Sequence, residues 1–476
     1  MRPRAVVGLL VGGLLFGLVV ALPAPQGLSP AAWRTAAVGL LMASWWVSEA
    51  IPIPATALLP LVLFPILGVV PIAAAAAPFA NPLIYLFLGG FLLAQGMQAA
   101  GLPRRIALGT VRVFGTRPGS VVAGIMAACA FLSMWVSNTA TALMMLPIGL
   151  SLVELLPGDR DDPGRRRFGT VLMLGIAYAC SVGGMGTLIG TPPNAFLAGF
   201  VLESYGEAIG FAQWMLLGVP LVAIGLPLVF LLLTRVIFPI PFAEIPGGRE
   251  MLERRIDALG PVRTAERRVA AVFALTALAW ITRPITERWV PGLSDAGIAI
   301  AAATALFLIP SGDGRGKRLL TWELAENAPW GVLVLFGGGL SLAGAIERTG
   351  LGDWLGGQMH AFAGWPLPLL VVVVVASIIA LTELTSNTAT AATFLPVLGA
   401  VAIAFGRDPL VLAVPAALAA SGAFMLPVAT PPNAIVYGSG ALEIGDMVRA
   451  GIWMNVAFTV LITALTWALV PVVFGL

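Results

Sequence analysis

Two short polar phrases recur in an otherwise apolar chain, and their side chains could hold a polar ligand. The tripeptide Ser137-Asn138-Thr139 returns 249 residues later as Ser386-Asn387-Thr388. A second phrase, Thr-Pro-Pro-Asn-Ala, begins at Thr191 and again at Thr430. Asparagine amides donate and accept hydrogen bonds, and threonine hydroxyls add donors and oxygen atoms. Such groups could bind an anion through neutral donors and a hard cation such as sodium through oxygens.

Groups for other chemistry are scarce. Cys129 and Cys180 lie in apolar runs, where we expect two buried small residues instead of a disulfide or a metal site. His360 is the one histidine of the sequence, so neither a zinc cluster nor a histidine triad can be built. Because no paired acids accompany the motifs, we expect neither an intramembrane enzyme nor a cofactor.

The composition is that of a polytopic membrane protein. Hydrophobic residues make up 59% of the chain and charged residues 10%, with a mean hydropathy of +0.97. Soluble domains have roughly 45–50% apolar and about 25% charged residues. The net charge is +3, but the arginines gather in a few loops, which indicates membrane topology and not nucleic-acid binding.

Apolar windows predict an all-α fold with about eleven transmembrane helices and two longer stretches. The spans are expected at 5–22, 33–50, 52–71, 83–100, 168–203, 211–234, 269–282, 292–310, 328–346, 409–441 and 451–475. The two stretches, 118–155 and 365–405, are too long for one span and barely long enough for two. Each has its Ser-Asn-Thr near the middle, so we predict two re-entrant hairpins with the tripeptide at the tip.

Arginine placement predicts the sidedness, because loops rich in arginine and lysine stay in the cytoplasm. The flanks of the first hairpin are arginine-rich and include Arg160, as are the segments 235–268 and 311–318, the latter with Arg315. The flanks of the second hairpin are poor in positive charge. We therefore expect a multi-pass plasma (inner) membrane protein, with a cytoplasmic N-terminus on an uncleaved first span and the C-terminus outside. The first hairpin would enter from the cytoplasm and the second from outside.

Hairpins that enter from opposite faces make the two halves inverted-topology repeats, with broken helices and a shared site near the bilayer midplane. Proline removes a backbone donor, so each Thr-Pro-Pro should break its span. The expected division is 1–34, N-terminal span and entry; 35–235, first repeat with broken helix 168–203; 236–268, cytoplasmic linker; and 269–476, second repeat with broken helix 409–441.

Two carboxylates in apolar surroundings could relay protons. Glu49 lies at a span end and is expected at the interface. Glu383 adjoins the second tripeptide, where helix-stabilising hydrogen bonding and cation coupling are both open. Oxygens near the motifs, such as the hydroxyl of Ser133 and the carbonyls of Gly190 and Ala429, could bind sodium.

The duplicated motifs, with the entry Glu49-Ala50-Ile51-Pro52, resemble those of the divalent anion/sodium symporter (DASS) family over essentially the whole chain. The resemblance implies a homodimer with a scaffold and a transport domain that moves like an elevator. It also implies a C4-dicarboxylate, citrate or sulfate as substrate. We expect sodium-coupled import of succinate, malate or fumarate, with sodium-independent exchange as the alternative mechanism and citrate or sulfate as the alternative substrate.

The same resemblance assigns residues to three sites. The substrate contacts would be Asn138, Thr139, Thr191, Asn387, Thr388, Thr430 and Pro431. Sodium site 1 would comprise Ser133, Ser137, Asn138 and Gly190, and sodium site 2 would comprise Thr382, Thr385, Asn387 and Ala429. Residue 385 is variable in type in the family and would act through its carbonyl.

Overall fold

The computed structural model describes residues 3–115, 117–156, 162–240, 242, 244–314, 316–358 and 364–476. Arg160, Arg315 and His360 lie outside these ranges. Within them the protein is helical, and its one β pairing is a bridge between Pro310 and Arg318. By length and composition, seven of the described helices can cross a membrane, and six shorter apolar helices accompany them. The all-α polytopic fold class is confirmed.

Each of the two long apolar stretches folds as a pair of helices joined by a four-residue tip. The first pair is α8 (Pro118–Ser133) and α9 (Asn138–Glu154), and the second is α19 (Leu367–Thr382) and α20 (Asn387–Ala404). Ser137 is the N-cap of α9, and its hydroxyl accepts the Ala140 N–H at 3.3 Å. An N-cap serine satisfies a backbone donor that the first helical turn leaves free, so the tripeptide itself starts the second helix.

The two Thr-Pro-Pro phrases break the helices in which they lie. Helix α10 (Pro163–Gly184) ends before the first phrase, and α11 (Pro192–Tyr205) begins within it. Likewise α21 (Leu410–Ala420) and α22 (Pro431–Gly438) are separated by the second. Proline is well suited to the first helical position, where its missing N–H has no partner to lose. The breaks predicted in 168–203 and 409–441 are therefore present.

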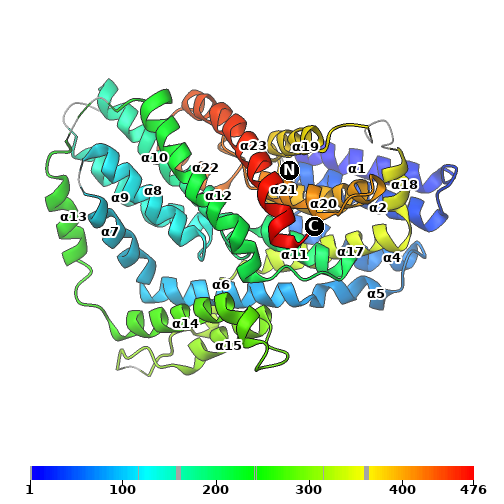
Figure 1. Cartoon of the computed structure of the whole chain (residues 1–476), viewed down its shortest axis with the longest axis horizontal. Helices are drawn as coiled ribbons and strands as arrows, with labels where there is room; N and C mark the ends of the chain where they lie inside the picture. The colour runs from blue at the N-terminus through cyan, green and yellow to red at the C-terminus, as the bar shows by residue number, and fades with distance from the viewer. Residues whose placement is uncertain are drawn as a thin grey trace.

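The two halves interlock through these short helices. Helix α11 packs on α20 of the second hairpin, and α22 packs on α9 of the first. In Figure 1 the first hairpin (cyan) and the second (yellow to orange) lie on opposite sides of the molecule, with α23 (Ile444–Phe474) between them. Residues far apart in the sequence are thereby brought to the centre.

Other helices surround this centre. In Figure 1, α14 (Thr264–Thr286) and α15 (Asp295–Leu308) run beside α6 (Pro82–Ala100), and both contact it. The expected span 52–71 contains five prolines, at 52, 54, 60, 65 and 71, and folds as two short helices. The remaining helices are α1 (Pro3–Ala21), α2 (Pro30–Ser48), α3 (Ile53–Thr56), α4 (Leu59–Ile66), α5 (Ile72–Ala76), η1 (Ala77–Ala80), α7 (Leu102–Phe114), α12 (Phe211–Leu231), η2 (Leu232–Ile237), α13 (Gly248–Asp257), α16 (Trp322–Ala325), α17 (Trp330–Arg348) and α18 (Leu351–Gln358).

A buried ion pair joins α7 to the start of α14. The Arg105 guanidinium lies 3.1 Å from the Glu266 carboxylate, and the Glu266 side chain is 4% exposed. Arg105 also donates to the carbonyl of Gly260, and the Arg263 N–H donates to Glu266 at 2.8 Å. Because each charge is paired and hydrogen-bonded, the junction is expected to be rigid.

Cys129 on α8 and Cys180 on α10 are buried and free, and their thiols contact each other. The expectation of two buried small residues is confirmed. Glu49 ends α2 in the left-handed conformation, with φ of 49°, and is the one non-glycine residue with positive φ among the described residues. Its place at a helix end agrees with the sequence, whereas its position relative to a membrane stays a prediction.

Candidate functional site

The tip of the first hairpin contains buried oxygens that lack protein partners. Ser133 is fully buried at the end of α8. Its Oγ and the Oδ1 of Asn138 are buried and accept no hydrogen bond within the described part of the chain. A buried polar atom without a partner costs about 1–3 kcal/mol. These two oxygens are therefore available to a ligand.

Glycine allows three chain segments to converge beside these oxygens. A Cβ at Gly184 would lie 3.0 Å from Asn138 Oδ1 and 3.0 Å from the carbonyl oxygen of Gly190. A Cβ at Gly190 would in turn lie 2.4 Å from the Gly184 carbonyl oxygen. The end of α10, the loop after it and the hairpin tip thus meet at one point. Two of the oxygen ligands predicted for sodium site 1, Asn138 and Gly190, lie there.

The second hairpin brings together the corresponding oxygens. The hydroxyl of Thr382 lies 2.7 Å from Asn387 Oδ1 and 2.9 Å from the carbonyl oxygen of Ala420. The Thr385 hydroxyl donates to the Leu381 carbonyl at 2.9 Å and lies 2.6 Å from the Thr390 hydroxyl, both within its own hairpin. Ala429 is 5% exposed, in the loop that follows α21. Thr382 and Asn387 are thus in contact, as a shared ion site requires.

The predicted substrate residues all lie at helix N-termini. Asn138 and Thr139 begin α9, and Asn387 and Thr388 begin α20. Thr191 is the N-cap of α11, and Thr430 is the N-cap of α22, directly before Pro431. A helix N-terminus carries a partial positive charge and free N–H groups, both of which favour an anion. The helices that begin at these residues pair across the two halves, α22 with α9 and α11 with α20.

The two halves also touch directly at this point. The hydroxyls of Thr191 and Ser421 are 3.3 Å apart, and both residues are 2% exposed. Tyr178 of α10 donates its hydroxyl to the Phe424 carbonyl at 2.7 Å. A residue of the first Thr-Pro-Pro phrase therefore contacts the loop that precedes the second.

Two asparagines whose role was not predicted hold the loops at the helix breaks. Asn194 Nδ2 donates to the carbonyls of Gly184, Met185 and Thr187, at 3.3, 3.3 and 2.8 Å. Asn433 Nδ2 makes the same kind of contact with Ala423 and Leu426, at 3.5 and 3.0 Å. The sequence signal that could have revealed this role is the asparagine at the same place in both Thr-Pro-Pro-Asn-Ala phrases. Its partners are backbone carbonyls, which no sequence motif reveals.

Trp135 is a second residue that the motifs did not single out. Its ring lies in the first hairpin tip, stacked on Phe211 at 5.9 Å and Trp280 at 6.4 Å between centroids. Phe273 meets it edge-on at 5.0 Å. The tip is thus anchored against α12 and α14 by aromatic packing, which contributes beyond the buried area alone.

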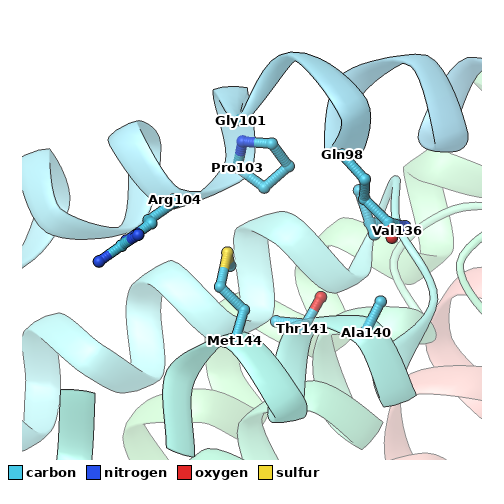
Figure 2. A pocket seen from close by; sticks show the side chains of 8 residues that line it. All are labelled: Gln98, Gly101, Pro103, Arg104, Val136, Ala140, Thr141 and Met144. Atoms are coloured by element: carbon cyan, nitrogen blue, oxygen red, sulfur yellow. The ribbon is translucent and has the colours of Figure 1, made fainter. Parts of the chain in front are cut away.

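A cavity of about 260 Å³ lies beside this tip but outside the site described above. It is lined by the junction of α6 and α7 on one side and by the tip and first turns of α9 on the other. Figure 2 shows Thr141 and Met144 of α9 pointing toward Pro103. None of the predicted substrate residues lines it.

Comparison with known proteins identifies the family of the chain. The family described as "Sodium:sulfate symporter transmembrane region" matches residues 4–474. The chain belongs to this family. It is 43% identical to the "Sodium-dependent dicarboxylate transporter SdcS" of Staphylococcus saprophyticus, over 99% of this chain and 92% of that protein. The corresponding transporter of Staphylococcus aureus (strain MRSA252) is 40% identical over the same shares.

A solved structure has a similar fold. The YdaH transporter of Alcanivorax borkumensis, whose crystal structure "reveals an unusual topology", aligns with a TM-score of 0.61 at 15% identity. The alignment covers 99% of this chain and 97% of that one. At this identity the likeness concerns the fold alone. The family and the named relatives make the chain a multi-pass membrane transporter and not an enzyme.

Proposed function

We propose that this member of the sodium:sulfate symporter family imports a C4-dicarboxylate, such as succinate, malate or fumarate, together with sodium. The observation that carries the proposal is the pair of buried, unpartnered oxygens on Ser133 and Asn138 beside the Gly190 carbonyl. A set of neutral oxygens suits a hard cation. Relatives at 40–43% identity are named as sodium-dependent dicarboxylate transporters, which supports the same assignment.

The anion would be held without a basic side chain. Neither repeated phrase contains lysine or arginine. The four helix N-termini at the motifs supply N–H groups, and bound sodium ions add positive charge nearby. A dianion with two separated carboxylates suits a site whose donors come from two hairpins.

Asn138 and Asn387 would couple the two ligands. An asparagine amide has an acceptor oxygen and a donor NH2 on one rigid plane. When the oxygen binds sodium, the NH2 is turned toward the substrate carboxylate. Ion binding would thereby organise the anion site, which is how an ion gradient can drive uptake.

Transport would follow an elevator-type alternating-access movement of the two hairpins and broken helices. We infer two inverted repeats, 35–235 and 269–476, with the site between them near the midplane. The N-terminus would be cytoplasmic and the C-terminus outside. The protein would act as a homodimer, as the resemblance to the DASS family implies.

Uptake of radiolabelled succinate into proteoliposomes tests the proposal. An inward sodium gradient should drive accumulation, and replacing sodium with choline should abolish it. Uptake that ignores sodium but requires internal dicarboxylate would contradict symport and identify an exchanger. Competition by unlabelled citrate or sulfate that exceeds competition by malate and fumarate would overturn the C4-dicarboxylate assignment.

A further inference from the structure

Glu383 is a buried carboxylate at the tip of the second hairpin, directly after Thr382. It is 4% exposed and lies at the C-terminal end of α19. No lysine or arginine among the described residues pairs with it. Burying an unpaired charge is costly unless hydrogen bonds replace its water. Its neighbours must therefore supply the donors.

Four donor groups surround the Glu383 carboxylate. The backbone N–H groups of Phe424, Met425 and Leu426 donate to it at 2.7, 2.9 and 3.1 Å, and the Met425 N–H also lies 3.0 Å from the second oxygen. Asn455 Nδ2 donates at 2.9 Å. A carboxylate has about four lone-pair positions. Oε1 accepts from Phe424, Met425 and Asn455, and Oε2 accepts from Leu426 and shares the Met425 N–H, so both oxygens are engaged by the protein.

The three N–H groups belong to the loop that presents Ala429. In that loop the Leu426 carbonyl accepts the Ala429 N–H at 3.2 Å and the Asn433 amide at 3.0 Å. Leu426 is thus held on its N–H side by Glu383 and on its carbonyl side by Asn433. The position of the Ala429 carbonyl, a predicted ligand of sodium site 2, follows from this anchoring.

Helix α23 closes over the same loop. A Cβ at Gly451 would lie 2.4 Å from the Met425 Cα, so glycine is required for the backbones to approach. Asn455 lies one turn further along the same face of α23, since residues four apart are neighbours on a helix. Gly451 and Asn455 together position the loop between α23 and the hairpin tip.

In the first half, the loop at the helix break is held without a carboxylate. Met134 stands 249 residues before Glu383, and its backbone carbonyl accepts the Thr187 hydroxyl. The loop after α10 is otherwise held through its carbonyls, by Asn194 and by the Trp214 ring nitrogen. Anchoring of the loop by a carboxylate is therefore found in the second half and not in the first.

We propose that Glu383 is a positioning residue that anchors loop 424–429 and thereby shapes sodium site 2, and that it neither ligates sodium nor carries a proton. The inference rests on the proposed sodium symport and assigns one residue to the ion site within it. It resolves the choice between hydrogen bonding and cation coupling at this position.

Glu383→Gln in the full-length protein tests the anchoring. The substitution keeps the shape but replaces one acceptor oxygen with an NH2 group that faces backbone N–H donors. Hydrogen exchange followed by mass spectrometry should show faster exchange of amides 424–426, with other segments unchanged. In proteoliposomes the sodium half-saturation constant should rise about tenfold, equivalent to about 1.4 kcal/mol, with most of the maximal rate retained at saturating sodium. The sodium activation curve should shift equally at pH 6 and pH 8.

Two further variants complete the experiment. Glu207→Gln makes the same change at an exposed carboxylate and should leave both measurements at the wild-type value. Asn455→Ala removes one of the four donors and should give smaller changes in the same direction. If Glu383→Gln does not fold, Asn455→Ala decides between the outcomes.

Wild-type exchange of amides 424–426 in the variants would overturn the anchoring, and an unchanged sodium curve would overturn its link to site 2. A pH dependence of wild-type uptake that Glu383→Gln removes would identify a proton carrier instead. If wild-type uptake proves independent of sodium, the proposed function fails, while the exchange measurement still tests the anchoring.

Discussion

Gly184→Ala should loosen sodium site 1 while the protein still folds. The added Cβ would lie 3.0 Å from Asn138 Oδ1, 3.1 Å from Asn138 Nδ2 and 3.0 Å from the Gly190 carbonyl oxygen. These separations are shorter than ordinary contacts, so the amide or the loop must move by a few tenths of an ångström. Both groups are predicted sodium ligands, and the displacement therefore acts on the ion site itself.

The expected size of the effect follows from overpacking. An extra methyl group in a packed interior costs about 1–3 kcal/mol. If this free energy is lost from sodium binding, the sodium half-saturation constant rises roughly five- to 150-fold. Succinate uptake into proteoliposomes over a range of sodium concentrations measures it. Raising the sodium concentration should restore most of the rate, because bound sodium draws the Asn138 amide back to its place.

Gly169→Ala is a matched control in the same helix, α10. Its Cβ would lie 3.6 Å from Val153 Cγ1, which is an ordinary contact. Alanine favours a helix over glycine by about 1 kcal/mol. The control should therefore fold at least as well as the wild type and keep its sodium dependence. A folded Gly184→Ala protein with a wild-type sodium curve would refute the placement of site 1.

Four other substitutions test the remaining contacts. Asn138→Ala and Asn387→Ala should each abolish succinate uptake without altering size-exclusion elution, because each removes both an ion ligand and a substrate donor; normal uptake would contradict the site. Thr191→Val removes the hydroxyl that meets the other half and should raise the succinate half-saturation constant about tenfold, by roughly 1.4 kcal/mol. An unchanged constant would place that hydroxyl outside the site. Arg105→Ala leaves Glu266 with the Arg263 N–H but without its charged partner, and should reduce stability by about 1–3 kcal/mol, measured as a lower melting temperature that Glu266→Ala partly restores. An equal loss of stability in Arg105→Ala and in the double variant with Glu266→Ala would contradict the pairing.

The hairpins and helix breaks could be predicted from local chemistry. A capping serine acts on the next backbone N–H groups and a proline acts on its own backbone, so Ser137 and Pro192 mark helix starts wherever the chain is placed. Local chemistry was applied less well to span 52–71, where five prolines were read as part of one apolar window. Apolar content predicts burial in a membrane, but the prolines decide whether the helix continues.

The partners of the site residues could not be predicted, because they are set by tertiary contacts. Asn194 bonds to carbonyls seven to ten residues before it, and Trp135 stacks on rings of α12 and α14. Glu383 reaches a loop more than 40 residues away. Sequence spacing placed Glu383 beside the motif but left open what its carboxylate contacts.

The two proposed ion sites are built from the same motif and yet are not equivalent. In the first half the oxygens of Ser133 and Asn138 have no partner in the described protein, so a bound ion would supply their missing interactions. In the second half the Thr382 hydroxyl and Asn387 Oδ1 already contact each other, and Glu383 holds the adjoining loop. Preorganised ligands bind with less ordering cost. Site 2 should therefore depend on the anchoring of its loop, whereas site 1 should depend on space around Gly184, and variants of the two should shift sodium activation independently.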